Sequence, residues 1–155
     1  MTKPRKARTD SVDNLIRLAT AANEELAPPA HVPLTDASLP FWESIMAEMA
    51  VADWSPHRRE LAVLLARVMA SLEENQRKLR EEGTVVADAN GIPRANPRMK
   101  VVNGQLSQVL ALRRSLALTG RAMAGGSQKA AHQREANRAA ERRFLRGTDR
   151  DDLLA

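Results

Sequence analysis

Two long stretches of the chain repeat apolar residues at helical spacing, and a short stretch with turn signals separates them. In the first stretch, steps of three, four or seven residues align Leu61, Leu65, Val68, Leu72 and Leu79. In the second, similar steps align Met99, Val102, Leu106, Val109, Arg113 and Leu116. Each set lies along one face of a helix. Two such helices with a short connection predict an antiparallel helical hairpin.

Both predicted helices begin with a capping residue followed by proline, at Ser55–Pro56 and at Asn96–Pro97. Serine and asparagine accept hydrogen bonds from the first turn, where the missing N–H of proline would be unpaired anyway. We expect the helices to end at Glu82–Gly83 and at Thr119–Gly120, because glycine is the preferred residue after a helix.

The segment between these helices, residues 83–95, has the composition of a β-hairpin. Residues 84–86 (Thr-Val-Val) favour a strand, and Asn90–Gly91 is the strongest short hairpin signal. Ile92–Pro93 follows. The sequence therefore predicts a short β-like hairpin at the tip of an otherwise all-α fold, with shorter N-terminal helices packed on the long hairpin.

The first of these shorter helices is capped by Asp10 or Ser11 and fades near Leu26. Three prolines within residues 28–33 then predict an extended connector, since proline does not fit a helix interior.

The second short helix is expected over residues 37–52. Its apolar face comprises Phe41, Trp42, Ile45, Met46 and Met49. Residues 53–55 then form a tight turn into the long helix over 56–82. This is the outline of a helix-turn-helix, although any short corner between two helices gives the same outline.

The two ends of the chain are basic and the middle is nearly neutral. Residues 1–9 contain four basic side chains and no acid, residues 121–155 contain eight basic and five acidic side chains, and residues 10–120 contain twelve basic and fourteen acidic. Basic ends on a near-neutral body indicate a polyanion as partner, most often nucleic acid. The candidate contacts are Lys3, Arg5, Lys6, Arg8, Arg17, Arg134, Arg138, Arg142, Arg143 and Arg146, with Arg58 and Arg59 added if the helix-turn-helix is real.

We divide the chain into a disordered basic arm (1–9), a helical core and oligomerisation domain (10–120) and a flexible basic C-terminal segment (121–155). Residues 128–146 favour a helix by propensity but have almost no apolar stripe, so this helix needs a partner to be stable. If it forms, Arg134, Arg138 and Arg142 make one basic ridge, because they are four residues apart.

The residues that most enzymes need are missing. The chain has no cysteine and no glycine-rich phosphate-binding loop, and His31, His57 and His132 are isolated in sequence. We therefore expect no enzyme, cofactor or metal site. No apolar run approaches the roughly 20 residues of a membrane span, so we expect a soluble intracellular protein.

A helical hairpin with so few aromatic residues makes a thin core, which favours burial of its second face against another chain. The expected interface comprises Leu65, Leu72, Leu79, Val102, Leu106, Val109, Arg113 and Leu116. In that interface Arg113 could pair with an acid such as Glu73 or Glu74.

The layout resembles the small terminase subunit of tailed double-stranded DNA bacteriophages. The resemblance covers residues 28 to about 120 and rests on order and spacing: the proline-rich segment 27–31, Pro40-Phe41-Trp42, Trp54-Ser55-Pro56 and the linker between the two helices. It implies a non-enzymatic packaging factor of the host cell cytoplasm that forms ring-shaped homo-oligomers, often nonamers. Such rings recognise the packaging start site on viral double-stranded DNA and present it to the large terminase subunit, which supplies ATPase and nuclease.

Two other functions fit the same pattern. A helix-turn-helix regulator would act as a dimer on a compact operator, although it needs neither the long second helix nor the linker. A structural adaptor would use its basic end to bind an acidic protein and would not bind random DNA.

Overall fold

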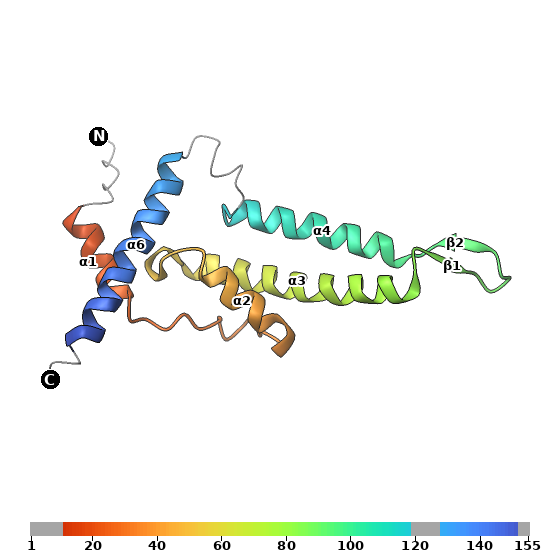
Figure 1. Ribbon diagram of the computed structural model, residues 1–155, viewed down its shortest axis with the longest axis horizontal. Helices are drawn as coiled ribbons and strands as arrows, with labels where there is room; N and C mark the ends of the chain where they lie inside the picture. Colours follow the sequence, from red (N-terminus) through yellow and green to blue (C-terminus); the bar gives the residue numbers. More distant parts are fainter. Residues whose placement is uncertain (1–10, 119–127, 152–155) are drawn as a thin grey trace.

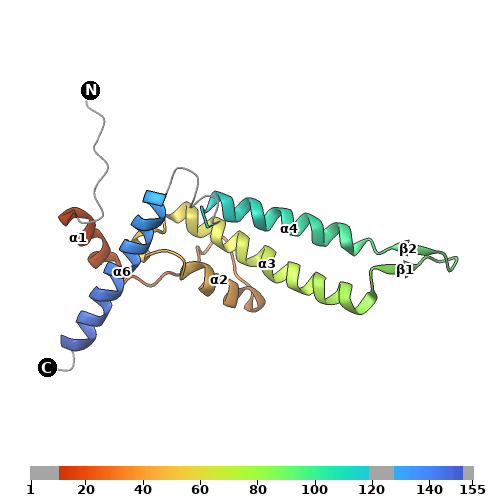
Figure 2. The ribbon, with the colours of Figure 1, turned by 45° about the horizontal axis from the view of Figure 1, so that its top comes forward.

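The computed structural model describes residues 11–118 and 128–151, with the side chains of residues 11–118 and 132–146. The described chain is mostly helical and contains one two-stranded antiparallel hairpin, as predicted. Helices α3 (Pro56–Glu82) and α4 (Arg98–Ser115) lie side by side as an antiparallel pair (Figure 1). The β-hairpin extends from one end of this pair, and α1 and α6 lie at the other end (Figures 1 and 2).

The boundaries of α3 are those predicted from its caps. The hydroxyl of Ser55 accepts a hydrogen bond from the backbone N–H of Arg58 at 3.3 Å, and Pro56 is the first helical residue. Gly83 ends the helix with φ at +84°, a conformation that side chains disfavour.

Helix α4 begins as predicted but ends earlier. The Asn96 side chain accepts a hydrogen bond from Arg98 N at 2.8 Å, which caps the first turn. The helix ends at Ser115, not at the expected Thr119–Gly120, which lies outside the described residues. Ala117 adopts a φ of +57°, and bonds from Leu118 N to Arg113 O and from Ala117 N to Arg114 O complete a Schellman motif. The glycine signal was misleading because alanine occupies the left-handed position.

The predicted β-hairpin is confirmed. Strand β1 (Val85–Ala87) pairs with β2 (Pro93–Ala95), and the central register joins Val86 to Arg94. Gly91 supplies the turn with φ at +76°. The Asp88 carboxylate accepts bonds from Asn90 N and Ile92 N, which fixes the loop between the strands.

The seam between α3 and α4 is apolar near the start of α3 and gains polar contacts toward the β-hairpin. Leu65 and Leu116 are buried near the start of α3. Nearer the β-hairpin, Gln105 Nε2 donates to Ser71 Oγ at 2.7 Å, and Arg98 donates to Asn75 at 2.9 Å. Arg98 also forms an ion pair with Glu82 at 2.7 Å, next to the β-hairpin.

The second short helix is split and shorter than predicted. A 3-10 turn, η1 (Asp36–Ser38), leads into α2 (Leu39–Met46), which packs on α3 through the predicted apolar face. The expected extension to residue 52 is wrong, because the chain leaves the helix after Met46 and forms η2 (Val51–Asp53). Trp54 anchors this connection: it is buried, and its Nε1 donates to Met46 O at 3.1 Å.

Helix α1 (Val12–Ala21) is capped by Ser11, whose hydroxyl accepts a bond from Asn14 N at 3.3 Å. It ends before the expected Leu26. Its main contacts are with η2 and with α6 (Gln128–Asp151), and not with the long hairpin on which we expected it to pack.

Candidate functional site

Helix α6 is held against α1 and η2 by a buried polar network. The Asn137 side chain, 3% exposed, accepts a bond from Asn14 Nδ2 at 3.1 Å and donates to Asp53 Oδ2 at 3.1 Å. Arg17 joins the network through an ion pair with Asp53 at 2.9 Å and a bond to Asn14 Oδ1. Four side chains from three distant segments therefore fix the position of α6.

Two further contacts extend this docking along α6. Glu141 Oε1 accepts a bond from Val51 N, the first N–H of η2, at 2.7 Å. Burial raises the pKa of Glu141 above its ordinary value, although the Val51 N–H opposes the shift. At the other end, Arg134 donates to Ala117 O at 2.7 Å, which connects α6 to the end of α4.

Arg134, Arg138 and Arg142, the predicted basic ridge, all lie on α6, together with Arg143 and Arg146. The five arginines differ in exposure. Arg134 and Arg138 are half-buried, whereas Arg142, Arg143 and Arg146 are exposed. Because Asn137 and Glu141 occupy the docked face, the exposed arginines lie on the flanks and the outer face of the helix. These three arginines form an exposed basic surface at the end of the molecule where α1 and α6 lie.

Three other candidates make contacts within the chain. Arg17 binds Ala52 O at 2.7 Å as well as Asp53. Arg58 is exposed, and its guanidinium donates to Asp53 O at 3.0 Å. The Arg59 side chain is 24% exposed and lies 3.8 Å from a carboxylate oxygen of Glu24.

The connection between α2 and α3 does not form the predicted helix-turn-helix. Nine residues, 47–55, separate α2 from α3 in place of the predicted three-residue turn. Lys3, Arg5, Lys6 and Arg8 lie outside the described residues, so their role stays a prediction.

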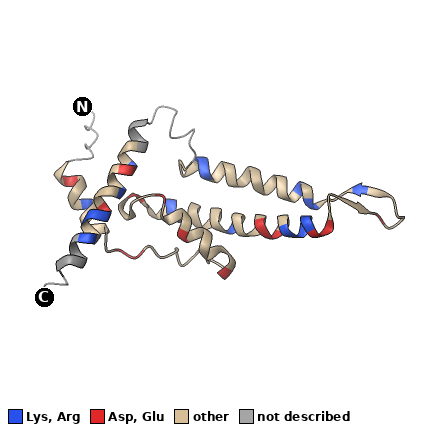
Figure 3. Ribbon diagram, in the orientation of Figure 1, with Lys and Arg blue, Asp and Glu red and all other residues tan. Residues whose placement is uncertain are grey.

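Charges on the half of α3 near the β-hairpin pair with one another. Basic and acidic residues alternate there in Figure 3. Within this helix Arg77 pairs with Glu74 and Glu81, Lys78 with Glu74, and Arg80 with Glu73, at 2.8–3.2 Å. Mutual neutralisation makes this surface a poor binding site for a polyanion.

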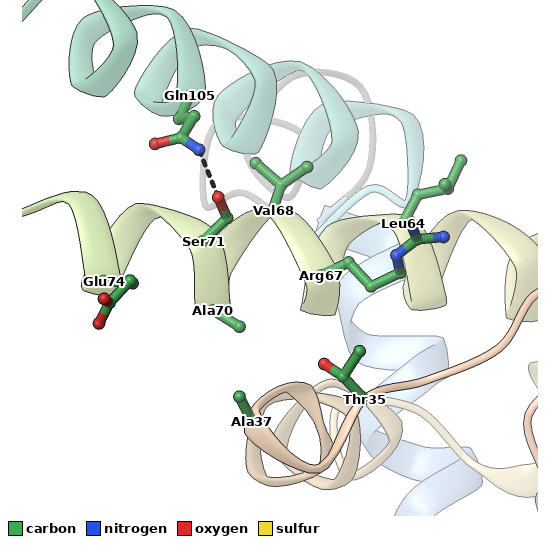
Figure 4. A pocket seen from close by; sticks show the side chains of 9 residues that line it. All are labelled: Thr35, Ala37, Leu64, Arg67, Val68, Ala70, Ser71, Glu74 and Gln105. Atoms are coloured by element: carbon green, nitrogen blue, oxygen red, sulfur yellow. Dashed lines mark hydrogen bonds between the residues drawn. The ribbon is translucent and has the colours of Figure 1, made fainter. Parts of the chain in front are cut away.

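Two apolar surfaces lie on opposite flanks of the long hairpin. One is a groove of about 520 Å³ between η1 and α3, with Ala37, Leu64, Val68 and Ala70 as its apolar lining and Gln105 on its rim (Figure 4). The other is a stripe on α4 formed by Met99, Leu106 and Leu110, which are 36%, 40% and 50% exposed. The stripe lies about 100–140° around α4 from Gln105. The sequence pattern did not select Leu64 and Leu110, because neither falls on the seam.

The predicted interface residues occupy three environments. Leu65, Val102 and Leu116 are buried within the chain, Leu72, Leu79, Val109 and Arg113 are half-buried, and Leu106 is exposed. Antiparallel packing pairs the level of Gln105 with that of Ser71, so Arg113 lies far along the hairpin from Glu73 and Glu74 of its own chain. Pairing of Arg113 with those acids in a second chain stays a prediction.

His31 and His57, isolated in sequence, lie against the same carboxylate. His31 Nε2 is 3.0 Å from Glu60 Oε1, and His57 Nδ1 is 3.3 Å from Glu60 Oε2. Hydrogen bonds from His57 and His31 lower the pKa of Glu60. Within residues 11–118 and 132–146, no group of three or more His, Asp or Glu is arranged to hold a metal ion.

A comparison with protein families matches all of residues 1–155 to the Hendrixvirinae small terminase family. The chain belongs to this family. Membership confirms the resemblance to phage small terminases and suggests a role in DNA packaging, which favours that function over the regulator and the adaptor. A comparison with curated proteins gave no match. No helix in the described parts of this small terminase is long and apolar enough to cross a membrane.

Proposed function

We propose that this small terminase is a non-enzymatic packaging factor that forms a ring-shaped homo-oligomer, with nine subunits as the expected number. The ring binds the packaging start site on viral double-stranded DNA and recruits the large terminase subunit. The observation that carries the proposal is the separation of surfaces. Exposed arginines gather on α6 at one end of the molecule, while unpartnered apolar side chains flank the α3–α4 hairpin.

The two apolar flanks suit a ring because they differ from each other. An interface between unlike surfaces is heterologous, and it closes into a ring when the rotation between neighbours allows. The stripe of Met99, Leu106 and Leu110 on one subunit would pack into the groove beside Leu64 on the next. Each half-exposed leucine still has about 1 kcal/mol to gain from burial.

Light scattering of two single variants and their mixture tests this interface. Leu110→Glu damages the stripe and Leu64→Glu damages the groove, so each variant alone should be monomeric. Mixed together they should form dimers, because each contributes one intact surface. The control is Ala111→Glu, which places the same charge on an exposed face of α4 away from the stripe. Rings from either single variant would contradict the proposed interface.

DNA binding would come from many weak contacts. Each phosphate neutralised on duplex DNA contributes about −0.9 to the slope of log K against log salt. A ring presents the α6 arginines many times, so avidity compensates for weak individual contacts. Because these arginines lie on exposed flanks of α6 and suit contacts with phosphates, we expect backbone and shape recognition to dominate.

An electrophoretic series with charge-matched variants tests the DNA surface. Replacing Arg142, Arg143 and Arg146 by alanine should weaken binding and flatten the salt dependence. The control replaces Arg77, Lys78 and Arg80 by alanine, which removes the same charge from the self-paired surface of α3. Equal losses in both triple variants would contradict the placement of DNA on α6. Very strong discrimination between packaging-site and scrambled DNA would contradict shape recognition.

A further inference from the structure

The β-hairpin at the tip has one protected edge and one unprotected edge. Asn96 N donates to Thr84 O, and Asp88 N donates to Ile92 O, each at 2.9 Å. Hydrogen-bonded and non-hydrogen-bonded pairs alternate along an antiparallel ladder. The pairs between these bonds, Val85 with Ala95 and Ala87 with Pro93, are therefore non-hydrogen-bonded. Their backbone polar groups point away from the partner strand, toward the outer edges.

The two outer edges differ in their outward hydrogen-bonding groups and in their charge. On β2 the outward position of Pro93 has no N–H, and the neighbouring Arg94 is charged; proline and charge are devices that protect sheet edges. On β1 the outward residues are Val85 and Ala87, which present two N–H and two C=O groups and no charge. Edge β1 therefore offers two outward N–H groups and edge β2 only that of Ala95, so an added strand pairs better with β1.

One face of the hairpin is also apolar and exposed. Val85, Ala87, Pro93 and Ala95 form two directly opposed pairs, so their side chains share a face, and all four are exposed. At the base of β1 a pocket of about 350 Å³ is lined by Leu79, Val102 and Thr84, among others. In strand addition, main-chain bonds supply affinity and a neighbouring pocket that accepts a side chain supplies specificity.

We infer that the outer edge of β1 binds an extended polypeptide segment of the large terminase subunit, with an apolar side chain of that segment in the pocket at the base of β1. The inference rests on the recruitment proposed above and assigns it to a site. Strand β1 carries no charge, and the arginines beside it are paired: Arg94 with Asp88 at 2.8 Å, and Arg80, in the lining of the pocket, with Glu73 at 3.2 Å. The surface therefore suits a polypeptide and not DNA. It lies at the opposite end of the molecule from the α6 arginines, so both partners can bind together (Figure 2).

A second copy of β1 is a poorer occupant. A three-residue strand spans only about 10 Å. Pairing two such strands buries far less than the roughly 1,200 Å² of a stable protein interface. A peptide segment of a larger partner, by contrast, gains avidity, because each subunit of the proposed ring offers one β1 edge.

The test measures binding of purified, labelled large terminase subunit to the full-length protein. Ala87→Pro removes one outward N–H of β1 without removing a ladder bond, and it should weaken binding about tenfold or more. Val85→Lys keeps the backbone intact and should also weaken binding, because a lysine protects the edge. The matched control is Ala95→Pro, which removes the outward N–H on the protected edge and should bind as the original chain does. Light scattering and thermal melting should show that all variants assemble alike.

Three results would overturn the inference. Equal binding by all variants would exclude the β1 edge while leaving recruitment intact. No binding by the original chain would contradict recruitment itself. Disulfide-linked copies of a Val85→Cys variant, in a chain that otherwise has no cysteine, would show that a second copy occupies the edge.

Discussion

Replacing Asn137 by alanine should release α6 from the rest of the protein. The Asn137 side chain is buried and bonds to two segments at once, Asn14 in α1 and Asp53 in η2. The buried described side chains of α6, Asn137 and Glu141, are both polar, so polar bonds carry part of the docking energy.

The cost follows from the two bonds that alanine removes. The bond from Asn14 joins neutral groups and is worth about 1 kcal/mol, while the bond to the Asp53 carboxylate is worth about 1.5–3 kcal/mol. Their sum, about 2.5–4 kcal/mol, lowers the ratio of docked to undocked α6 by about 60- to 700-fold. Alanine is also the better helix former, so helix propensity cannot account for a loss.

Hydrogen exchange of the α6 amides measures this effect, and limited proteolysis gives a second readout. We expect α6 in the Asn137→Ala variant to exchange much faster, while the amides of α3 and α4 keep their protection. Gln133→Ala, on an exposed part of the same helix, serves as the control. Protection of α6 equal to that of the original chain would refute the role of the buried network.

Three further predictions concern the hairpin and its core. Ala117→Gly should raise the free energy of unfolding by about 0.5–1 kcal/mol in urea titrations, because Ala117 has a φ of +57°; a loss of stability would argue against strain there. Leu65→Ala should lower it by about 2–5 kcal/mol, since Leu65 is 1% exposed, whereas Leu39→Ala at a 41% exposed position should cost far less. Hydrogen bonds from Arg98 and then Asn96 lower the pKa of Glu82 from 4.5 to about 2, so ionised Glu82 stabilises the fold fully above about pH 4.5. That stabilisation is lost as the pH falls toward 2, and thermal melts of Glu82→Gln should converge with those of the original chain there; a constant gap between the two would contradict it.

Local chemistry in the sequence determined the long hairpin and its tip. Ser55, Asn96 and Gly83 act within one turn of their own positions, so their capping roles follow from residue type and neighbours. The hairpin turn at Gly91 is equally local. The end of α4 was misjudged because its left-handed residue is Ala117, which has no sequence signal for that conformation.

Tertiary packing decided what surrounds the hairpin. The partnership of α1 with α6 depends on Asn14 and Asn137, which are 123 residues apart, and nothing local marks either side chain for burial. Apolar spacing gave the seam of the hairpin, but only the packed structure separates the buried Leu65 from the exposed Leu106 and reveals Leu64 and Leu110 on the flanks. The physical reason is range: caps and turns are set by bonds between near neighbours, whereas docking and exposure depend on which distant surfaces meet.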